Sequence, residues 1–417
     1  MALYDPTSEP HGSLYADLTQ SWSDVGGGVR TYLRHKRRHI LDNTPHRHLL
    51  IVPGAEDAVE CEGGGRGLTV TIASPKVPGS PHYRLMLRNG AVRSVLAEHR
   101  PDLIECQDAY NLPWAAIGHA RRHPRTALVA AYCTDFPTVY VERPFGRWLG
   151  RPVGAAASKL CYSYCSRLYR QFDAVYAMSE NGGAAKLRAL GVPDVDVVPL
   201  GVELGQFSPE KRDPALRRKL GLSDGQPLLT YVGRMDFEKR PHVVVEAFRR
   251  LPQSLGAALL LIGDGPQREQ FTALEAERIF APGYCRDRDD LAAWLASADI
   301  YVSAMADETF GISIIEAQAS GLPVVGVAAG AMVDRVPRGL GLVGEVDDAA
   351  VMASNIVSLL HGDMAMMSER ARTHALQFSW DQSMERLFGR VYRSALAKAG
   401  ARAVDAARAP SDLLAEA

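Results

Sequence analysis

Two glutamates eight positions apart, Glu308 and Glu316, mark the most informative stretch of the chain, which reads DETFGISIIEAQASGLPVV from Asp307 to Val325. A small-residue helix is expected in its second part, ending at Gly321 before Pro323 breaks the pattern. Eight residues span roughly two helical turns, so a carboxylate in the loop before the helix and one on its face can point into one site. Acids bind hydroxyls and a helix N-terminus binds phosphate, so this arrangement is typical of a site for a sugar nucleotide.

A second group of residues suits a diphosphate. Gly233 and Arg234 end an apolar strand pattern, LLTYVG, and Lys239 follows five residues after the arginine. Arginine offers a rigid fork of donors and lysine a mobile point charge, so together they can hold a diphosphate. Gly263 and Gly265 lie in a turn, GDGP, after the next strand pattern, where glycine lets the backbone approach a ligand closely.

The E-x7-E pattern within ETFG and EAQASGLPVV, together with G-R-x-x-x-x-K, resembles the donor-site signature of the family 4 retaining glycosyltransferases, which have the GT-B fold. The resemblance covers essentially the whole chain and is most specific over 228–326. It implies that Glu316 binds the ribose hydroxyls and Glu308 those of the transferred sugar. Arg234 and Lys239 would hold the nucleotide diphosphate. The backbone N–H groups expected to face the sugar and the distal phosphate are those of Phe310, Gly311 and Ile312.

The first half of the chain carries two further segments of the same resemblance. A glycine cluster, Gly26–Gly28, opens a helical pattern, and Gly27 and Gly28 are expected to touch the donor diphosphate through bare N–H groups. The segment AYCTDFP, residues 131–137, resembles the YHTDFP segment of a subgroup that makes glycolipids and mannosides. Relatives have histidine where this chain has Cys133, and a thiol is a weak hydrogen-bond donor. The acceptor side is expected to include Cys133, Thr134 and Asp135.

The resemblance also implies a mechanism, with transfer that retains the anomeric configuration. The usual proposal is a front-face substitution, in which the leaving phosphate helps to deprotonate the acceptor hydroxyl. No metal is expected, because basic side chains and helix N-termini can stabilise the leaving diphosphate. The acids of DVD at 194–196 and DRDD at 287–290 have metal-like spacing but are interpreted as turn or helix-cap residues. The residues expected to be catalytic are Glu308, Asp135, Arg234 and Lys239.

Short apolar runs alternate with helical patterns along the chain, which is typical of parallel α/β sheets. Strands are expected near 48–53, 68–73, 102–106, 126–132, 174–178, 228–233, 257–262, 277–280, 299–303 and 323–326. Helices are expected near 28–42, 88–99, 112–123, 155–172 and 180–190. The fold class is therefore α/β, and the resemblance implies the GT-B arrangement, two Rossmann-like, doubly wound domains that face a cleft.

Three parts of the chain are predicted. An N-terminal, acceptor-binding domain takes residues 1–205, and a C-terminal domain that binds the nucleotide sugar takes 206–380. The join near 200–225 is rich in Pro and Gly. Residues 381–417 are predicted to form an amphipathic helix that packs back on the N-terminal domain, followed by a tail.

The composition excludes several classes of protein. At 417 residues with 47% hydrophobic residues the chain can fill two cores, and a net charge of −1 argues against an overall nucleic-acid binder. Six cysteines without a C-x-x-C pair favour reduced thiols. The N-terminus lacks a signal pattern, and no run approaches the roughly 18 apolar residues of a membrane span. A cytoplasmic protein, peripherally attached to the inner face of the membrane, is expected.

Basic residues alternate with aromatic residues between Arg143 and Arg170, and a second basic run covers 34–38. Such surfaces suit an anionic membrane. The first 200 residues carry 23 basic against 19 acidic side chains. Together with the YHTDFP resemblance, this favours a lipid or lipid-linked sugar as the acceptor. No part of the chain resembles an RNA-binding module.

The donor is expected to be a UDP-sugar that supplies a hexose, because the look-alikes of YHTDFP include UDP-dependent glycolipid synthases. A GDP-mannose-dependent mannosyltransferase or a polysaccharide glycosyltransferase is the alternative. Two lesser hypotheses are a non-catalytic scaffold that binds sugar nucleotides, which the Cys133 substitution favours, and a nucleotide-sugar epimerase, which shares the GT-B fold.

Overall fold

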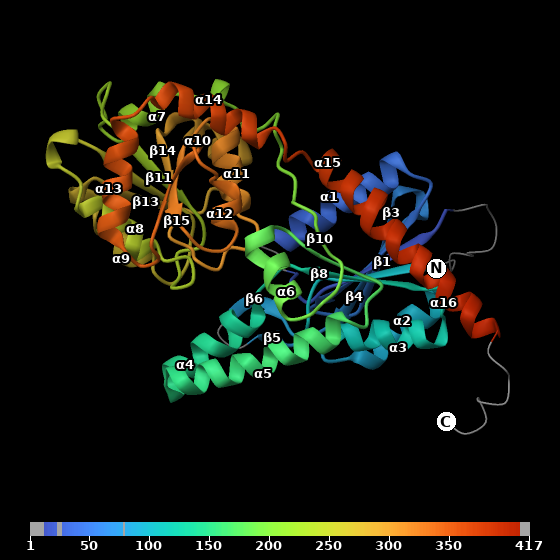
Figure 1. The fold of residues 1–417 in the computed structure, drawn as a ribbon. Coiled ribbons are helices and arrows are strands. Elements are labelled where there is room, and N and C mark those ends of the chain that lie inside the picture. The colour runs from blue at the N-terminus through green and yellow to red at the C-terminus, as the bar shows by residue number, and fades with distance from the viewer. Residues whose placement is uncertain (1–11, 23–26, 78–79, 409–417) are drawn as a thin grey trace. The chain divides into compact units, whose positions relative to one another are not determined.

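The computed structural model of the chain describes residues 12–22, 27–77 and 80–408, which form two compact units. The first unit consists of the chain up to Met178, Ala184–Val198 and the segment from Ser383 onward; the second consists of Ser179–Gly183 and Pro199–Gln382. Each unit is a β-sheet covered by helices (Figure 1). Both ends of the chain therefore contribute to the first unit.

The first unit holds a mainly parallel sheet. In the order of neighbours, its strands are β10 (Val195–Val197), β9 (Ala174–Ala177), β8 (Ala127–Tyr132), β7 (Leu103–Cys106), β1 (Leu14–Leu18), β2 (Arg47–Gly54), β4 (Gly67–Ala73) and β3 (Ala58–Glu62). Neighbours pair in parallel except for β4 and β3, which are antiparallel. A separate ribbon is formed by β5 (Lys76–Val77) and β6 (Ser80–Arg84). The helical segments are α1 (Gly28–Asn43), η1 (Gly63–Gly65), α2 (Asn89–His99), α3 (Leu112–Arg122), η2 (Pro137–Glu142), α4 (Arg143–Leu149), α5 (Arg151–Tyr169), α6 (Ala185–Ala189), η7 (Leu387–Tyr392) and α16 (Arg393–Arg408).

The sheet of the second unit is parallel throughout the described strands. Its order is β13 (Ile279–Gly283), β12 (Ala258–Ile262), β11 (Leu228–Val232), β14 (Ile300–Val302), β15 (Val324–Val327) and β16 (Gly341–Gly344). Its helical segments are η4 (Pro209–Lys211), α7 (Pro214–Lys219), α8 (Pro241–Arg249), η5 (Gln253–Leu255), α9 (Arg268–Thr272), η6 (Glu275–Glu277), α10 (Arg288–Ser297), α11 (Ile312–Ala319), α12 (Ala331–Arg335), α13 (Ala349–Leu360) and α14 (Met364–Ala375). Two segments, η3 (Glu180–Ala184) and α15 (Trp380–Arg386), cross from one unit to the other.

The strand order of both sheets is that of a doubly wound fold. In each sheet the first strand, β1 or β11, lies in the interior with later strands on both sides. Strands such as β8 (ALVAAY) and β12 (ALLLI) are buried at every position, as expected where helices cover both faces of a parallel sheet. The prediction of two Rossmann-like α/β domains is confirmed.

The interior strand β1 was not among the strands predicted from the sequence. All five of its residues are buried, including Asp17 at 0% exposure. Asp17 is paired with the charge of Lys36 of α1, whose Nζ lies 2.6 Å from Oδ1, and it accepts a hydrogen bond from His48 of β2, whose Nε2 lies 2.6 Å from Oδ2. A buried carboxylate interrupts the apolar run by which such a strand is recognised, so its sequence, LYADL, gives no clear strand pattern.

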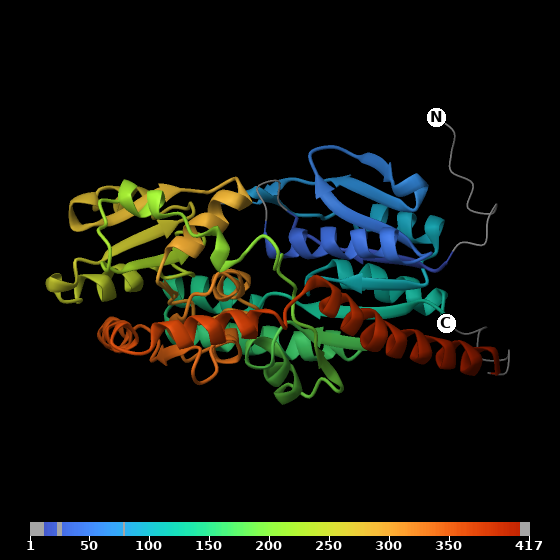
Figure 2. The same ribbon diagram turned by 90° about the horizontal axis from the view of Figure 1, so that it is seen from above.

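The same buried charges attach the C-terminal segment to the first unit. Lys36 Nζ also lies 3.1 Å from Glu105 Oε2, and it donates to the Tyr392 hydroxyl at 2.7 Å. That hydroxyl in turn donates to Glu105 Oε2 at 2.7 Å. Further along, Arg402 pairs with Asp173. The C-terminal helix therefore packs on the first unit, as predicted, and Figure 2 shows it running along that unit.

A pH dependence follows from His48. Arg37 Nε donates to its Nδ1 at 2.9 Å, so the ring proton lies on Nε2 and points at Asp17. Burial lowers the pKa of His48 to about 4. Between about pH 6.5 and that value the unfolded chain takes up a proton that the folded chain refuses, so stability falls as the pH drops. In urea unfolding followed over this range, we expect wild type to lose on the order of 2–3 kcal/mol.

The His48→Gln variant tests this assignment, because glutamine can keep a donor toward Asp17 and does not titrate. Its unfolding free energy should change less between about pH 6.5 and pH 4 than that of wild type. The carboxyl of Asp17, whose pKa stays below its ordinary value of 3.8 because Lys36 and His48 outweigh its burial, loses its contribution only at lower pH. An equal slope in both proteins would assign the acid sensitivity to other groups.

Among the residues that the structure describes, no helix is both long and apolar enough to cross a membrane.

Candidate active site

The predicted donor-side residues gather at the carboxyl ends of two neighbouring strands of the second unit. Gly233 and Arg234 directly follow β11, and Glu308 lies in the loop between β14 and α11. β11 has β12 on one side and β14 on the other, so the strand order reverses here. Loops on the two sides of such a point diverge and leave room for a ligand at this edge of the sheet.

Lys239 and Glu308 form an ion pair at this edge. Lys239 Nζ lies 3.0 Å from Glu308 Oε2, and the two side chains are 23% and 13% exposed. Burial alone would raise the pKa of Glu308, but Lys239 and the backbone N–H groups of Gly311 and Phe310 bring it below its ordinary value. Glu308 is therefore ionised at neutral pH and can accept hydrogen bonds from sugar hydroxyls.

Glu308 also occupies the N-terminal end of α11. Its carboxylate accepts the backbone N–H groups of Phe310 and Gly311, two of the three amides that the sequence assigns to the sugar and the distal phosphate. Ile312, the third, is the first residue of the helix. A ligand phosphate at this helix end therefore competes with Glu308 for the same donors, and its binding requires the carboxylate to turn away.

Glu316 lies in the middle of α11, and its side chain is 3% exposed. Its Oε1 lies 2.5 Å from Arg288 Nη2, and the Arg288 guanidinium lies 4.8 Å from the ring centroid of Phe207. Burial raises the pKa of Glu316 above its ordinary value, although the charge and hydrogen bond of Arg288 oppose the rise. The pKa values of Glu308 and Glu316 are thus shifted in opposite directions. Arg288 favours the ionised form of Glu316, the more buried of the two.

Arg288→Met is expected to weaken binding of a nucleoside diphosphate most strongly at low pH. Without the guanidinium the pKa of Glu316 rises further, so the carboxylate that should accept the ribose hydroxyls is protonated over a wider range. Tyr301 of β14, whose own pKa is raised by burial, also faces Glu316 and does not ionise in this range. Calorimetric titration should give affinity about tenfold lower than wild type near pH 6, with recovery toward about pH 9.

Two variants serve as controls for this prediction. Arg288→Lys keeps the positive charge and should restore most of the affinity. Glu316→Gln cannot ionise and should bind weakly at every pH. A loss in Arg288→Met that is the same across the pH range would mean that the arginine acts through packing on Phe207.

Arg234 follows β11 and is held by acids of its own loop. Its Nη1 lies 2.8 Å from Asp236 Oδ2 and its Nη2 lies 2.9 Å from Glu238 Oε2, while the side chain is 58% exposed. The Tyr231 hydroxyl donates to the Arg234 carbonyl at 2.7 Å, which fixes the backbone of the turn. The guanidinium is thus accessible, and a diphosphate has to replace these carboxylates as its partner.

Gly263 and Gly265 allow the loops after β11 and β12 to pack closely against each other. A Cβ on Gly263 would lie 1.9 Å from the Gly233 carbonyl oxygen, and one on Gly265 would lie 2.6 Å from that of Met235. Gly233 N–H donates to the Ile262 carbonyl at 3.0 Å in the same contact. Close packing between the two loops therefore requires glycine at both positions, in addition to the close approach of a ligand that the sequence predicts.

Two contacts that the sequence did not reveal support the Glu308 loop. Arg335 is 4% exposed, donates from Nε to the Phe310 carbonyl at 2.9 Å, and places its guanidinium 4.4 Å from the centroid of the Phe310 ring. Ser179, from the short segment that joins the second unit, donates from Oγ to the Thr309 carbonyl at 2.8 Å. These contacts fix the backbone that carries Glu308.

Gly27 and Gly28 lie at the start of α1 in the first unit. Thr31 N–H donates to the Gly27 carbonyl at 3.1 Å, and the position of a Cβ on Gly28 has no atom within 4 Å. The first turn of the helix carries no acid, and within the described residues no side chain caps it. Gly26 lies outside the described residues. The first turn of α1 therefore offers an anion no competing carboxylate of its own.

The predicted acceptor-side residues follow β8 in the first unit. Cys133 Sγ lies 3.5 Å from Gln107 Oε1, and burial raises the pKa of the thiol well above its ordinary value, so it stays protonated. Thr134 is half-buried between Cys133 and Asp135. These residues and the Glu308–Lys239 pair belong to different units.

Asp135, predicted to be catalytic, has structural partners. It is 4% exposed, accepts the Tyr162 hydroxyl at 2.7 Å and pairs with Lys186 Nζ. Burial would raise its pKa, but Lys186 and Tyr162 bring it below the ordinary value. Since Tyr162 lies on α5 and Lys186 on α6, the carboxylate ties the loop after β8 to both helices.

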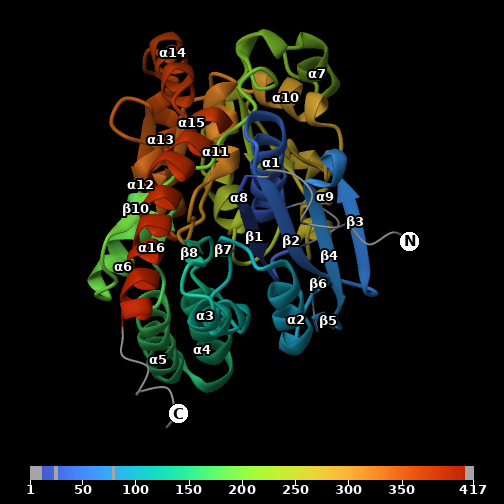
Figure 3. The same cartoon turned by 90° about the vertical axis from the view of Figure 1, so that its right-hand side faces the viewer.

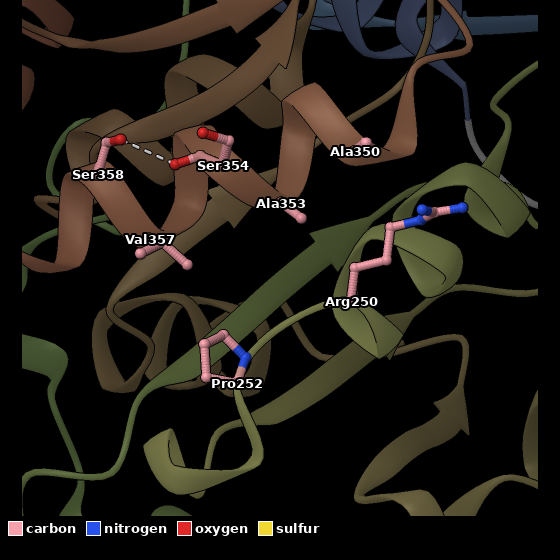
Figure 4. A pocket seen from close by; sticks show the side chains of 7 residues that line it. All are labelled: Arg250, Pro252, Ala350, Ala353, Ser354, Val357 and Ser358. Atoms are coloured by element: carbon pink, nitrogen blue, oxygen red, sulfur yellow. Dashed lines mark hydrogen bonds between the residues drawn. The ribbon is translucent and has the colours of Figure 1, made fainter.

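A cavity of about 390 Å³ lies elsewhere in the second unit, beside α13 and the end of α8 (Figure 4). Ser358 Oγ donates to the Ser354 carbonyl at 2.8 Å, and the Arg250 guanidinium pairs with Glu246 at 3.0 Å. None of the predicted site residues lines this cavity, so it carries none of the predicted chemistry. Its lining residues are Arg250, Pro252, Ala350, Ala353, Ser354, Val357 and Ser358.

Comparison with known proteins links this geometry to one class of enzyme. The family described as "Glycosyltransferase Family 4" matches residues 26–206, and the family described as "Glycosyl transferases group 1" matches residues 212–374. A GDP-mannose-dependent alpha-mannosyltransferase of Corynebacterium glutamicum is 31% identical over 338 residues, which cover 80% of this chain and 77% of the relative. A GDP-mannose-dependent alpha-(1-6)-phosphatidylinositol dimannoside mannosyltransferase of Mycobacterium tuberculosis is 28% identical, over 86% of this chain and 90% of the relative.

Solved structures agree on the fold. A sucrose-phosphate synthase of Thermosynechococcus elongatus superposes with a TM-score of 0.73 at 20% identity, over 93% of this chain and 100% of the other. WaaG, a glycosyltransferase involved in lipopolysaccharide biosynthesis, superposes with a TM-score of 0.64 at 17% identity, over 91% of this chain and 99% of the other.

Proposed function

This chain belongs to glycosyltransferase family 4 and has the GT-B fold, and we propose that it transfers mannose from GDP-mannose, with retention of configuration, to a hydroxyl of a lipid-linked acceptor at a membrane surface. The observation that carries the proposal is the constellation at the carboxyl ends of β11 and β14. Glu308 pairs there with Lys239, and Glu316, on the helix that follows the Glu308 loop, pairs with Arg288 at the start of α10. Such a set can hold sugar hydroxyls, ribose and diphosphate at once.

The choice of GDP-mannose comes from the relatives rather than from the site. The mannosyltransferases described above match most of this chain, and both use GDP-mannose. A UDP-sugar, favoured by the sequence, is the second candidate.

The site residues have separate parts in the proposed reaction. Lys239 and Arg234 stabilise the negative charge that develops on the diphosphate as its bond to the sugar C1 breaks. Glu308 orients the sugar through its hydroxyls, and Glu316 holds the ribose. The acceptor hydroxyl attacks C1 from the same face, and its proton passes to an oxygen of the departing diphosphate.

A lipid acceptor is favoured by two independent features. One relative is named for a phosphatidylinositol dimannoside substrate. In this chain the acceptor-side loop leads into basic, aromatic segments without any acid between Arg143 and Arg170. An acceptor anchored in an anionic membrane would be met by a surface of opposite charge.

Thermal unfolding in the presence of GDP, UDP, ADP and their sugar conjugates tests the donor. A ligand that binds only the folded protein raises Tm according to its saturation, so GDP and GDP-mannose should raise it and UDP should not. Release of GDP from GDP-mannose on addition of a mannolipid extract then tests transfer. Selective stabilisation by UDP would replace the proposed donor, and no shift with any nucleotide would contradict the site itself.

We propose further that the reaction needs no metal ion. With Arg234 and Lys239 to balance the diphosphate charge, turnover should be unchanged within about twofold after treatment with EDTA. The check is the rate of GDP release in chelator-treated protein, with and without added Mg²⁺ or Mn²⁺. A rate that collapses in chelator and returns with metal would show that these side chains do not suffice.

A further inference from the structure

A helical hairpin of the first unit exposes several large apolar side chains at its tip. α4 and α5 are joined by Gly150 alone and lie side by side (Figures 1 and 3). The strongly exposed apolar side chains at the tip are Trp148 at 85%, Leu149 at 62%, Phe145 at 45% and Val153 at 44%. Phe145, Trp148 and Leu149 are spaced i, i+3 and i+4, so they share one face of α4. We call residues 144–153 the hairpin tip.

The hairpin is rigidly built, so its exposed tip is not an accident of a loose loop. A Cβ on Gly154 would lie 2.5 Å from the Glu142 carbonyl oxygen and 2.7 Å from the Gly146 nitrogen, so only glycine lets the two helices approach this closely. Ser158 Oγ donates to Glu142 Oε2 at 2.8 Å across the same contact. The base is locked by Asp135, which accepts the Tyr162 hydroxyl.

The charge of the hairpin indicates which kind of partner it binds. Residues 143–170 contain six Arg or Lys and no Asp or Glu. Arg147 and Arg151 are exposed on the tip itself, next to Trp148. Tryptophan prefers the interface between water and lipid, and arginines beside it attract anionic headgroups.

We infer that the hairpin tip inserts Trp148 and Leu149 into the interfacial region of an anionic lipid membrane, while Arg147 and Arg151 bind its headgroups. The inference deepens the proposed function, on which its purpose rests, because it assigns the membrane contact to a specific element. The hairpin rises from the carboxyl end of β8, the strand that precedes Cys133–Asp135. The tip lies roughly 16 Å along α5 from Tyr162, at the base beside those residues.

Flotation of the full-length protein with lipid vesicles tests the inference. Wild type should bind vesicles of phosphatidylcholine mixed with phosphatidylglycerol and bind phosphatidylcholine alone much less. Trp148→Ser combined with Leu149→Ser should lower the partition coefficient at least about tenfold. Arg147→Glu combined with Arg151→Glu should lower it by a similar factor, with a weaker dependence on salt than wild type.

Matched controls separate the tip from general surface effects. Val59 of β3 is 60% exposed, so Val59→Ser removes an exposed apolar side chain elsewhere on the same unit. Arg218→Glu with Lys219→Glu reverses two charges on α7 of the second unit. Both controls should float like wild type. Tip variants that bind vesicles as well as the controls do would overturn the inference.

Two further measurements distinguish membrane binding by the tip from the proposed function and from self-association. Stabilisation by GDP should be the same in the tip variants and wild type, so loss of nucleotide binding in every protein would contradict the proposed function but not the membrane contact. Light scattering after gel filtration gives the oligomeric state. A dimer that the tip substitutions dissociate, with unchanged flotation, would mean that the tip binds a second copy of this chain instead of lipid.

Discussion

Lys239→Ala is expected to lower kcat/KM for sugar transfer by about 10²–10³-fold, the loss typical of removing one group that stabilises developing negative charge. The substitution has two effects at the same place. It removes the cation proposed to face the diphosphate, and it leaves Glu308 buried without the partner 3.0 Å away that keeps its pKa below the ordinary value. Measuring GDP release over a range of donor concentrations, with circular dichroism of the folded protein, checks the prediction.

Lys211→Ala provides the control for that experiment. Lys211 belongs to the same unit and lies 3.1 Å from Asp289 in a pair that is 42% and 67% exposed, where loss of the partner costs little. Its activity should equal that of wild type. Lys239→Arg keeps the charge and should retain part of the activity. If Lys239→Ala turns over like Lys211→Ala, the assignment of the donor site to this edge of the sheet is wrong.

Lys36→Met is expected to destabilise the first unit by about 3–5 kcal/mol, because it leaves two buried carboxylates without their cation. Lys36 is 0% exposed and lies 2.6 Å from Asp17 and 3.1 Å from Glu105. Methionine fills a similar volume, so the cost is electrostatic and does not come from a cavity. Urea unfolding at neutral pH should show the loss, and part of it should be recovered at lower pH as the carboxylate of Asp17, then without its cation, becomes protonated.

Lys398→Met is the matched control for the buried lysine. Lys398 lies 3.8 Å from Asp194 with 49% and 84% of the two side chains exposed, so its removal should change stability by less than about 1 kcal/mol. A Lys36→Met protein as stable as this control would mean that the buried acids are protonated or reached by water in the folded state.

The sequence predicted most of the fold because most strands are continuous apolar runs. It failed at β1, an interior strand of the first sheet. There Asp17 breaks the pattern, and its partners, the charged Lys36 and the hydrogen-bond donor His48, are 19 and 31 residues away in the chain. Such pairing is a property of the packed fold, so no local pattern could reveal it.

The sequence also suggested some residues of the candidate site and missed others. Glu308 and Lys239 lie together at one edge of the second sheet, where Arg234 follows β11, and Glu316 lies on the adjacent α11. Their parts in binding and catalysis stay predictions, and the residues that set their ionisation and backbone were missed. For Arg288 the sequence does contain a signal. A positive charge in the first turn of a helix opposes the helix dipole, so an arginine there indicates a partner elsewhere. Arg335 left no such trace, because its contacts with Phe310 depend on how α12 packs.

The C-terminal segment completes the packing of the first unit, and this has a consequence for synthesis on the ribosome. Tyr392 completes the hydrogen bonding of Lys36 and Glu105, and Arg402 pairs with Asp173, yet both are made after nearly all of the second unit. Until the C-terminal segment is synthesised, Asp173 lacks its arginine partner, and Lys36 and Glu105 lack the hydroxyl of Tyr392. The second unit, almost continuous in sequence, can therefore fold before the first unit is complete. The half of the enzyme that is translated first is the one that is finished last.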